Sequence, residues 1–111
     1  MRDPAKEPEV VGRAGEQDEP VPEELADLMT GYIGRAQDGA REAREALDRG
    51  DLEGARRYGH RIAGTAGSFG AVGLGALARA LEAAVRTRDP AAIAAALTAM
   101  DARLVVMAAA L

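Results

Sequence analysis

Apolar residues recur every three or four positions along the chain after residue 22, and no segment alternates apolar and polar residues over a useful length. The first pattern places apolar side chains on one face of an α-helix, whereas a half-buried strand would need the second. Turn signals interrupt the pattern at Gly50-Asp51, at Phe69-Gly70-Ala71 and at Asp89-Pro90. We therefore expect an all-α fold, an antiparallel four-helix bundle with short connections over residues 23–111.

The three interruptions predict the bounds of four helices: Glu23 to Arg49, Asp51 to about Ser68, Val72 or Gly73 to about Arg88, and Asp89-Pro90 onward. An aspartate followed by proline is typical of a helix N-terminus. The predicted buried stripes are, helix by helix, Leu25, Leu28, Tyr32, Ala36, Ala40, Ala43 and Leu47; Ala55, Ile62, Ala66 and Phe69; Leu74, Leu77, Leu81 and Val85; and Ile93, Leu97, Met100, Leu104, Met107 and Leu111.

Residues 1–22 differ from the rest of the chain, because they are rich in Asp, Glu, Pro and Gly and carry few large apolar residues. Such a segment buries too little apolar surface to offset the entropy lost on ordering. We expect a mobile, disordered acidic tail, more plausibly a solvated leader than a docking arm.

Composition excludes several classes of function. The chain of 111 residues has no cysteine and one histidine, so we expect one domain with no disulfide, no metal site and no cofactor. The net charge of −4 and the three aromatic residues argue against nucleic-acid binding. Asp101 and Arg103 interrupt the apolar segment 91–111, and no signal peptide is apparent, so we expect a cytoplasmic monomer without a membrane span.

His60 is the residue most suggestive of chemistry. It lies two positions from Ile62, about 200° around the helix, and therefore points away from the apolar stripe. Gly64 and Gly67 follow on the histidine face and leave the imidazole surroundings bare, which suits a ring approached by something large. Two other interpretations stand beside this one: such glycines also let helices pack closely, and a lone histidine is more often an ordinary surface or core residue.

The segment around His60 resembles the histidine-containing phosphotransfer (HPt) domain of two-component phosphorelays, over residues 25–90 and in kind over the last helix. The matching positions are His60, Ile62, Gly64, Ala66, Gly67, Phe69, Gly70, Ala71, Leu74, Leu77, Leu81 and Glu82, with the turn 47–53 upstream. The resemblance implies that His60 accepts a phosphoryl group from a receiver-domain aspartate and passes it to another receiver. It implies response-regulator receivers or a hybrid histidine kinase as partners, with Mg²⁺ held by the receiver.

One residue departs from the family pattern, which has a lysine three positions after the histidine, where this chain has Ala63. Arg56 and Arg57, at i−4 and i−3 from His60, can share its face, and Arg61 is adjacent but rotated by about 100°. Any of the three could balance phosphoryl charge in place of that lysine, or all could be solvated surface arginines.

Glu82 is the second candidate for a role beside His60. If Ala71 marks the centre of the turn between the second and third helices, His60 lies eleven residues before it and Glu82 eleven after. An antiparallel hairpin then places both at the same height, where the carboxylate could accept the imidazole Nδ1–H and leave Nε2 to attack. The phosphoacceptor domains of chemotaxis kinases have a glutamate in the matching place. The alternative is a solvent-facing glutamate.

The sequence has no glycine-rich ATP loop, so we expect a carrier without autokinase activity. We also expect a freestanding chain rather than part of a kinase. Two other functions remain open. Glu82 favours the phosphoacceptor domain of a chemotaxis-type histidine kinase, and Ala63 favours a helical module that binds a receiver without being phosphorylated.

Overall fold

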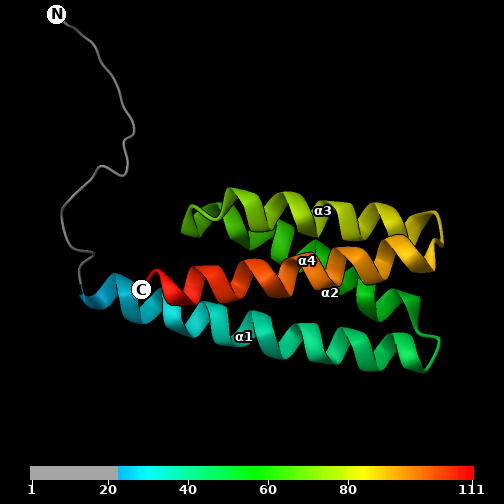
Figure 1. The fold of residues 1–111 in the computed structure, drawn as a ribbon, viewed down its shortest axis with the longest axis horizontal. Coiled ribbons are helices and arrows are strands. Elements are labelled where there is room, and N and C mark those ends of the chain that lie inside the picture. Colours follow the sequence, from blue (N-terminus) through cyan, green and yellow to red (C-terminus); the bar gives the residue numbers. More distant parts are fainter. Residues whose placement is uncertain (1–22) are drawn as a thin grey trace, which may run out of the picture.

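The computed structural model describes residues 23–111, and within them it contains helices and no strand (Figure 1). The predicted all-α four-helix bundle is confirmed, with α1 at Glu23–Asp48, α2 at Leu52–Ala66, α3 at Val72–Arg86 and α4 at Pro90–Ala109. A short 3₁₀ helix, η2, spans Gly67–Phe69. The acidic tail predicted for residues 1–22 lies outside the described residues.

The helices run up and down, and each packs against its neighbours in the chain (Figure 1). Helix α4 closes the ring by packing against α1 as well as α3, so α2 lies between α1 and α3. The α1–α2 and α3–α4 turns share one end of the bundle, and the α2–α3 turn lies at the other. This order leaves α2 one outward face, and that face carries His60.

Local chemistry accounts for the helix starts and the turns. Asp51 accepts a hydrogen bond from the Gly54 N–H at 3.0 Å, and Asp89 accepts one from the Ala92 N–H at 3.1 Å, so each carboxylate caps a helix as predicted. Gly50 and Gly70 adopt φ values of +79° and +69°, which glycine reaches without steric cost.

The α2–α3 turn is held by a contact to α1. Helix α2 tightens into η2 after Ala66, and the Ala71 N–H donates back to the Ala66 carbonyl at 2.9 Å. The Phe69 ring stacks on Tyr32 of α1, with their centroids 4.2 Å apart. The predicted turn at Phe69-Gly70-Ala71 is therefore also a point of attachment between α2 and α1.

The core is built from a few large side chains among many alanines. Its largest fully buried members come from α3 and α4: Leu74, Leu81, Leu97, Met100 and Leu104. Because most other core positions are alanine, the helices approach closely, and α1 and α2 meet where Gly39 faces Tyr58. Tyr58 is buried and its hydroxyl donates to the Ala36 carbonyl at 2.8 Å. Burial raises the pKa of this hydroxyl well above its ordinary value.

The predicted stripes were wrong at the open end of the bundle. Leu25, Leu28 and Leu111 are 46%, 60% and 49% exposed rather than buried. The first turns of α1 extend past the α2–α3 turn, and the chain ends beside them, so these side chains have no complete ring of helices around them (Figure 1). The pattern also missed Ile33 and Tyr58, which are buried. Four predicted core residues are only partly buried: Leu47, Phe69, Leu77 and Met107.

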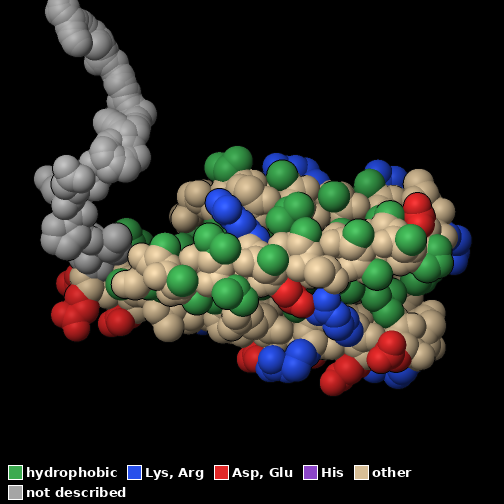
Figure 2. Space-filling view, in the orientation of Figure 1, with side chains coloured by type: hydrophobic (Ala, Val, Ile, Leu, Met, Phe, Trp, Pro, Cys, Tyr) green, Lys and Arg blue, Asp and Glu red, His purple; other side chains and the backbone are tan. Residues whose placement is uncertain are grey.

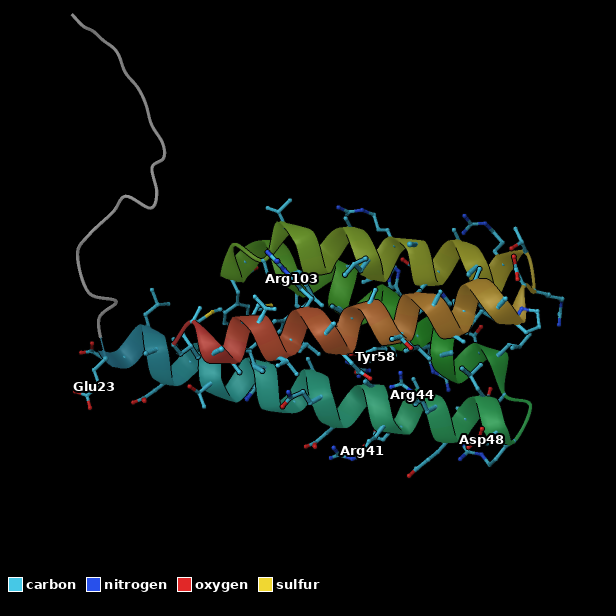
Figure 3. All side chains as sticks on the ribbon, viewed as in Figure 1. Glu23, Arg41, Arg44, Asp48, Tyr58 and Arg103 are labelled. Atoms are coloured by element: carbon cyan, nitrogen blue, oxygen red, sulfur yellow. The ribbon has the colours of Figure 1, made fainter. Side chains whose placement is uncertain are left out.

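Helix α4 is apolar on its outer side as well as its inner side. Figure 2 shows hydrophobic side chains over α4, with charged side chains mainly toward the edges of this face, over α1 and α3. By length and composition α4 could cross a membrane, with a mean hydropathy of 1.7, but a helix that supplies the core of a bundle has the same composition. Arg44 of α1, labelled in Figure 3, forms an ion pair with Asp101 of α4 at 2.6 Å, which links the two helices.

Two glycines of α1 should respond oppositely to alanine. A Cβ at Gly39 would lie 2.7 Å from the Tyr58 ring, whereas a Cβ at Gly34 would meet nothing within 4 Å. We expect Gly39→Ala to lower the free energy of unfolding by about 1–2 kcal/mol through overpacking. Gly34→Ala should raise it by about 0.5–1 kcal/mol through helix propensity. Thermal melts of both variants test this, and equal shifts in one direction would contradict it.

Candidate functional site

His60 stands on the outer face of α2 with its side chain 73% exposed. Its Nδ1 lies 3.0 Å from Oε2 of Glu82, which is on α3 and whose side chain is 20% exposed. The structure thus brings together the two residues that symmetry about Ala71 pairs in the sequence. A carboxylate only accepts hydrogen bonds, so the imidazole donates its Nδ1–H.

The pair depends on how closely α2 and α3 approach. A Cβ at Gly59 would lie 3.0 Å from the Ala78 carbonyl oxygen and 3.3 Å from Cγ of Glu82. Gly59 is buried, so the backbones of the two helices meet directly beside the histidine. Gly59 is not among the residues predicted for this site, although its position next to His60, three residues before the buried Ile62, was a usable signal.

The hydrogen bond to Glu82 sets the chemistry available to the ring. A proton held on Nδ1 leaves the Nε2 lone pair free, and an unprotonated nitrogen is what a nucleophilic imidazole needs. Within residues 23–111, no other hydrogen bond or ion pair reaches the His60 side chain. The arrangement is therefore an exposed imidazole with a carboxylate behind it, as in other sites where an acidic side chain orients a histidine.

Of the three candidate arginines, Arg56 is the one that forms an ion pair with Glu82. Its NH1 is 3.9 Å from Oε2 of Glu82, the same oxygen that accepts from His60. Its Nε and NH2 donate to the two carboxylate oxygens of Glu53 at 2.8 and 2.6 Å. The bond from Arg56 lowers the pKa of Glu53 below its ordinary value, and Glu53 in turn raises the pKa of Arg56. Both groups therefore stay charged at neutral pH.

The other two candidate arginines lie elsewhere. Arg57 places NH1 3.8 Å from Glu53 and does not contact Glu82. Arg61 lies on the side of α2 that faces α1. Its guanidinium carbon is 5.6 Å from the centroid of the Tyr58 ring, and its NH2 would lie 2.9 Å from a Cβ added at Gly39 of α1. Glu53 was missed by sequence analysis, even though its i, i+3 and i+4 spacing to Arg56 and Arg57 is typical of helix ion pairs.

The two glycines that follow His60 face open space. Gly64 and Gly67 are exposed, and a Cβ added at either would meet nothing within 4 Å. Close helix packing therefore does not explain them, whereas it does explain Gly59. The surface one and two turns beyond the imidazole is bare backbone.

A groove continues this surface toward α1. It has a volume of about 390 Å³, and its lining residues are Tyr32, Arg35, Ala36, Arg61, Ile62, Thr65 and Phe69. The Tyr32 hydroxyl and the Thr65 hydroxyl are 2.9 Å apart across it. In the part of the chain that the structure describes, no group of three or more acidic, histidine or cysteine side chains is placed to hold a metal ion.

Comparison with known families identifies the family of the chain. The Hpt domain family matches residues 17–110, most of the chain. The chain belongs to the Hpt domain family, which confirms the resemblance seen around His60. Hpt domains are phosphocarriers rather than kinases, and they serve histidine phosphotransfer in phosphorelays. Neither the curated proteins nor the solved structures contain a significant match to the chain.

The His60–Glu82 bond makes a prediction about the tautomer of the neutral ring. We expect Glu82→Ala to lower the population of the Nδ1–H tautomer, because that form loses its acceptor. Imidazole ¹⁵N chemical shifts of the unphosphorylated protein measure the two tautomers. Glu45→Ala, an exposed glutamate of α1, is the matched control and should leave the populations as they are. Unchanged populations in Glu82→Ala would mean that the carboxylate does not set the tautomer.

Proposed function

We propose that this protein carries phosphoryl groups in a His–Asp phosphorelay, with His60 as the phosphoacceptor. The single observation that carries the proposal is an exposed imidazole whose Nδ1–H is held by Glu82 at 3.0 Å. In the forward step the Nε2 lone pair attacks the phosphorus of a receiver aspartyl phosphate. The N–P bond forms as the P–O bond breaks, and the aspartate leaves as a carboxylate. The reverse step at a second receiver passes the group on.

Glu82 assists this step through charge. The imidazole keeps its Nδ1 proton while Nε2 bonds to phosphorus, so positive charge develops on the ring. A carboxylate 3.0 Å from Nδ1 stabilises that charge without taking part in bond making. Glu82 is therefore a positioning and charge-stabilising residue in this proposal.

Arg56 takes the place of the cation that the family pattern puts at Ala63. A guanidinium forms strong, directional bonds to phosphate oxygens. Of the three candidate arginines, Arg56 is the one within 4 Å of Glu82. In this proposal Arg57 and Arg61 belong to the surface that the receiver contacts.

The partner is a receiver domain that docks over Gly64 and Gly67. Its aspartate must come within bonding distance of Nε2, so receiver loops must lie against the turns of α2 that follow His60. The groove toward α1, with Arg35 and Arg61 at its sides, extends the same surface. The receiver supplies the Mg²⁺ and the aspartate, so the carrier has no cofactor or autokinase activity of its own. We further propose a cytoplasmic monomer that binds neither nucleic acid nor membrane.

A second candidate function differs only in the donor. Glu82 beside His60 favours the phosphoacceptor domain of a chemotaxis-type histidine kinase, in which an ATP-binding domain phosphorylates the histidine. The two candidates separate by experiment: labelled ATP with such a kinase domain supports the second, and phosphorylated receivers support the first. Binding to receivers without any labelling would instead support a non-phosphorylated interaction module.

The assignment of His60 predicts a complete loss of phosphorylation in one variant. A panel of phosphorylated receiver domains should label the wild-type protein with acid-labile phosphate, and His60→Gln should take up none. Because the side chain is 73% exposed, the melting temperature and helical content of His60→Gln should match those of the wild type. ATP alone should label neither protein. Phosphate persisting on His60→Gln would refute the assignment.

The docking surface predicts that stability and transfer separate at Gly64. Since a Cβ there meets nothing, Gly64→Ala should stabilise the helix by about 1 kcal/mol. Gly64→Leu and Gly64→Arg should hold the melting temperature yet slow transfer progressively as the side chain grows. Gly59→Ala is the contrasting variant, because its Cβ would meet the Ala78 carbonyl and lower the melting temperature. A parallel fall of stability and transfer in the Gly64 series would overturn the docking surface.

A further inference from the structure

Arg56 interacts with two carboxylates, those of Glu53 and Glu82, and it is bound more closely by Glu53. Glu53 holds it through two short hydrogen bonds, from Nε and from NH2, while Glu82 lies 3.9 Å from the remaining NH1. The guanidinium edge that carries Nε and NH2 is thus occupied by Glu53. Such a paired edge is what recognises two phosphate oxygens at once.

Phosphorylation of His60 changes what surrounds this guanidinium. A phosphoryl group brings about −1.5 to −2 charge and three acceptor oxygens at neutral pH. Arg56 lies one helical turn before His60, so it can turn toward that group. It cannot present its paired edge to the phosphoryl oxygens while the same edge is bonded to Glu53.

We propose that Glu53 is a positioning residue that competes with the phosphoryl group for Arg56. The inference rests on the proposed function of His60 as phosphoacceptor. By holding Arg56 back, Glu53 leaves the phosphoryl charge incompletely compensated, which keeps the group transferable to the next receiver. Glu53 touches neither the imidazole nor the phosphoryl group and acts only through Arg56.

Arg57 allows Arg56 to move between Glu53 and the phosphoryl group without leaving Glu53 unpaired. Its NH1 already lies 3.8 Å from Glu53, so the carboxylate retains a cation when Arg56 turns away. The ion pairs therefore link charged groups on both helices beside His60: Glu53, Arg56 and Arg57 on α2, and Glu82 on α3. Exposed ion pairs of this kind are weak, so the competition tunes phosphotransfer rather than switching it on or off.

The competition can be measured without knowing the partner. Phosphoramidate, a small phosphoryl donor with an N–P bond, is the probe. Nε2 of His60 attacks its phosphorus and forms a new N–P bond. The N–P bond of the donor breaks, and its protonated nitrogen leaves as ammonia. The ³¹P signal of the phosphorylated protein then reports the protonation of the phosphoryl group as pH is varied. A cation close to the group favours its dianion and lowers the midpoint of this titration.

We expect Glu53→Gln to lower the ³¹P midpoint by about 0.3 to 0.7 pH units, a two- to fivefold change in the equilibrium, because Arg56 is released to the phosphoryl group. Arg56→Gln should raise the midpoint. The effect of Glu53→Gln should largely disappear when it is combined with Arg56→Gln, since nothing is left to release. With any receiver that the wild type phosphorylates, Glu53→Gln should retain a larger share of phosphate on His60.

The controls separate this role from a general loss of charge. Glu45→Gln removes one negative charge from α1 and should leave the ³¹P midpoint at the wild-type value. Glu53→Asp keeps the charge and should restore part of the wild-type behaviour. An unchanged midpoint in Glu53→Gln, or an equal shift with and without Arg56, overturns the inference. A wild-type protein that takes no label on His60 from phosphoramidate or from receivers instead overturns the proposed function itself.

Discussion

The direct contact between the backbones of α2 and α3 at Gly59 is the constraint on which the site depends. With the Ala78 carbonyl oxygen 3.0 Å from where a Cβ would stand, even an alanine at this position requires the facing backbone to give way. That separation brings Glu82 within hydrogen-bond distance of His60, and it places Leu81 in the core behind them. Packing energy and the orientation of the imidazole are therefore set by the same contact.

Much of the fold followed from the sequence because its signals are local. The capping aspartates, the turn glycines and the three- and four-residue spacing of apolar side chains each act within one or two helical turns. The burial of Leu25 and Leu28 was predicted wrongly because it depends on a tertiary quantity, the relative lengths of the helices. A stripe on one helix cannot reveal that its neighbours stop short.

The candidate site likewise has one part that could be predicted from the sequence and one part that depends on tertiary packing. The pairing of His60 with Glu82 could be anticipated, since in an antiparallel helical hairpin the residues at equal distances in sequence from the turn centre lie at the same height. The choice among Arg56, Arg57 and Arg61 could not, because all three lie within one turn of His60 and only the packing of α2 on α3 brings one of them, Arg56, within 4 Å of Glu82. Tyr58 draws Arg61 toward α1, and Glu53 holds Arg56 beside Glu82. The spacing of Glu53 to Arg56 is visible in the sequence, whereas the approach of Arg56 to Glu82 depends on how α2 packs against α3.

The order of helices in the bundle has a consequence for how the molecule can be handled. Helix α4 packs against α1 and α3, and it lies across the bundle from the face of α2 that carries His60. Its outer side is therefore remote from His60 while remaining accessible along its length. A fluorophore, an immobilisation tag or a fused domain attached on the outer side of α4 would report on or tether the protein without crowding the imidazole. The same attachment on α2 or at the α2–α3 turn would lie on the surface over which we propose that the receiver docks.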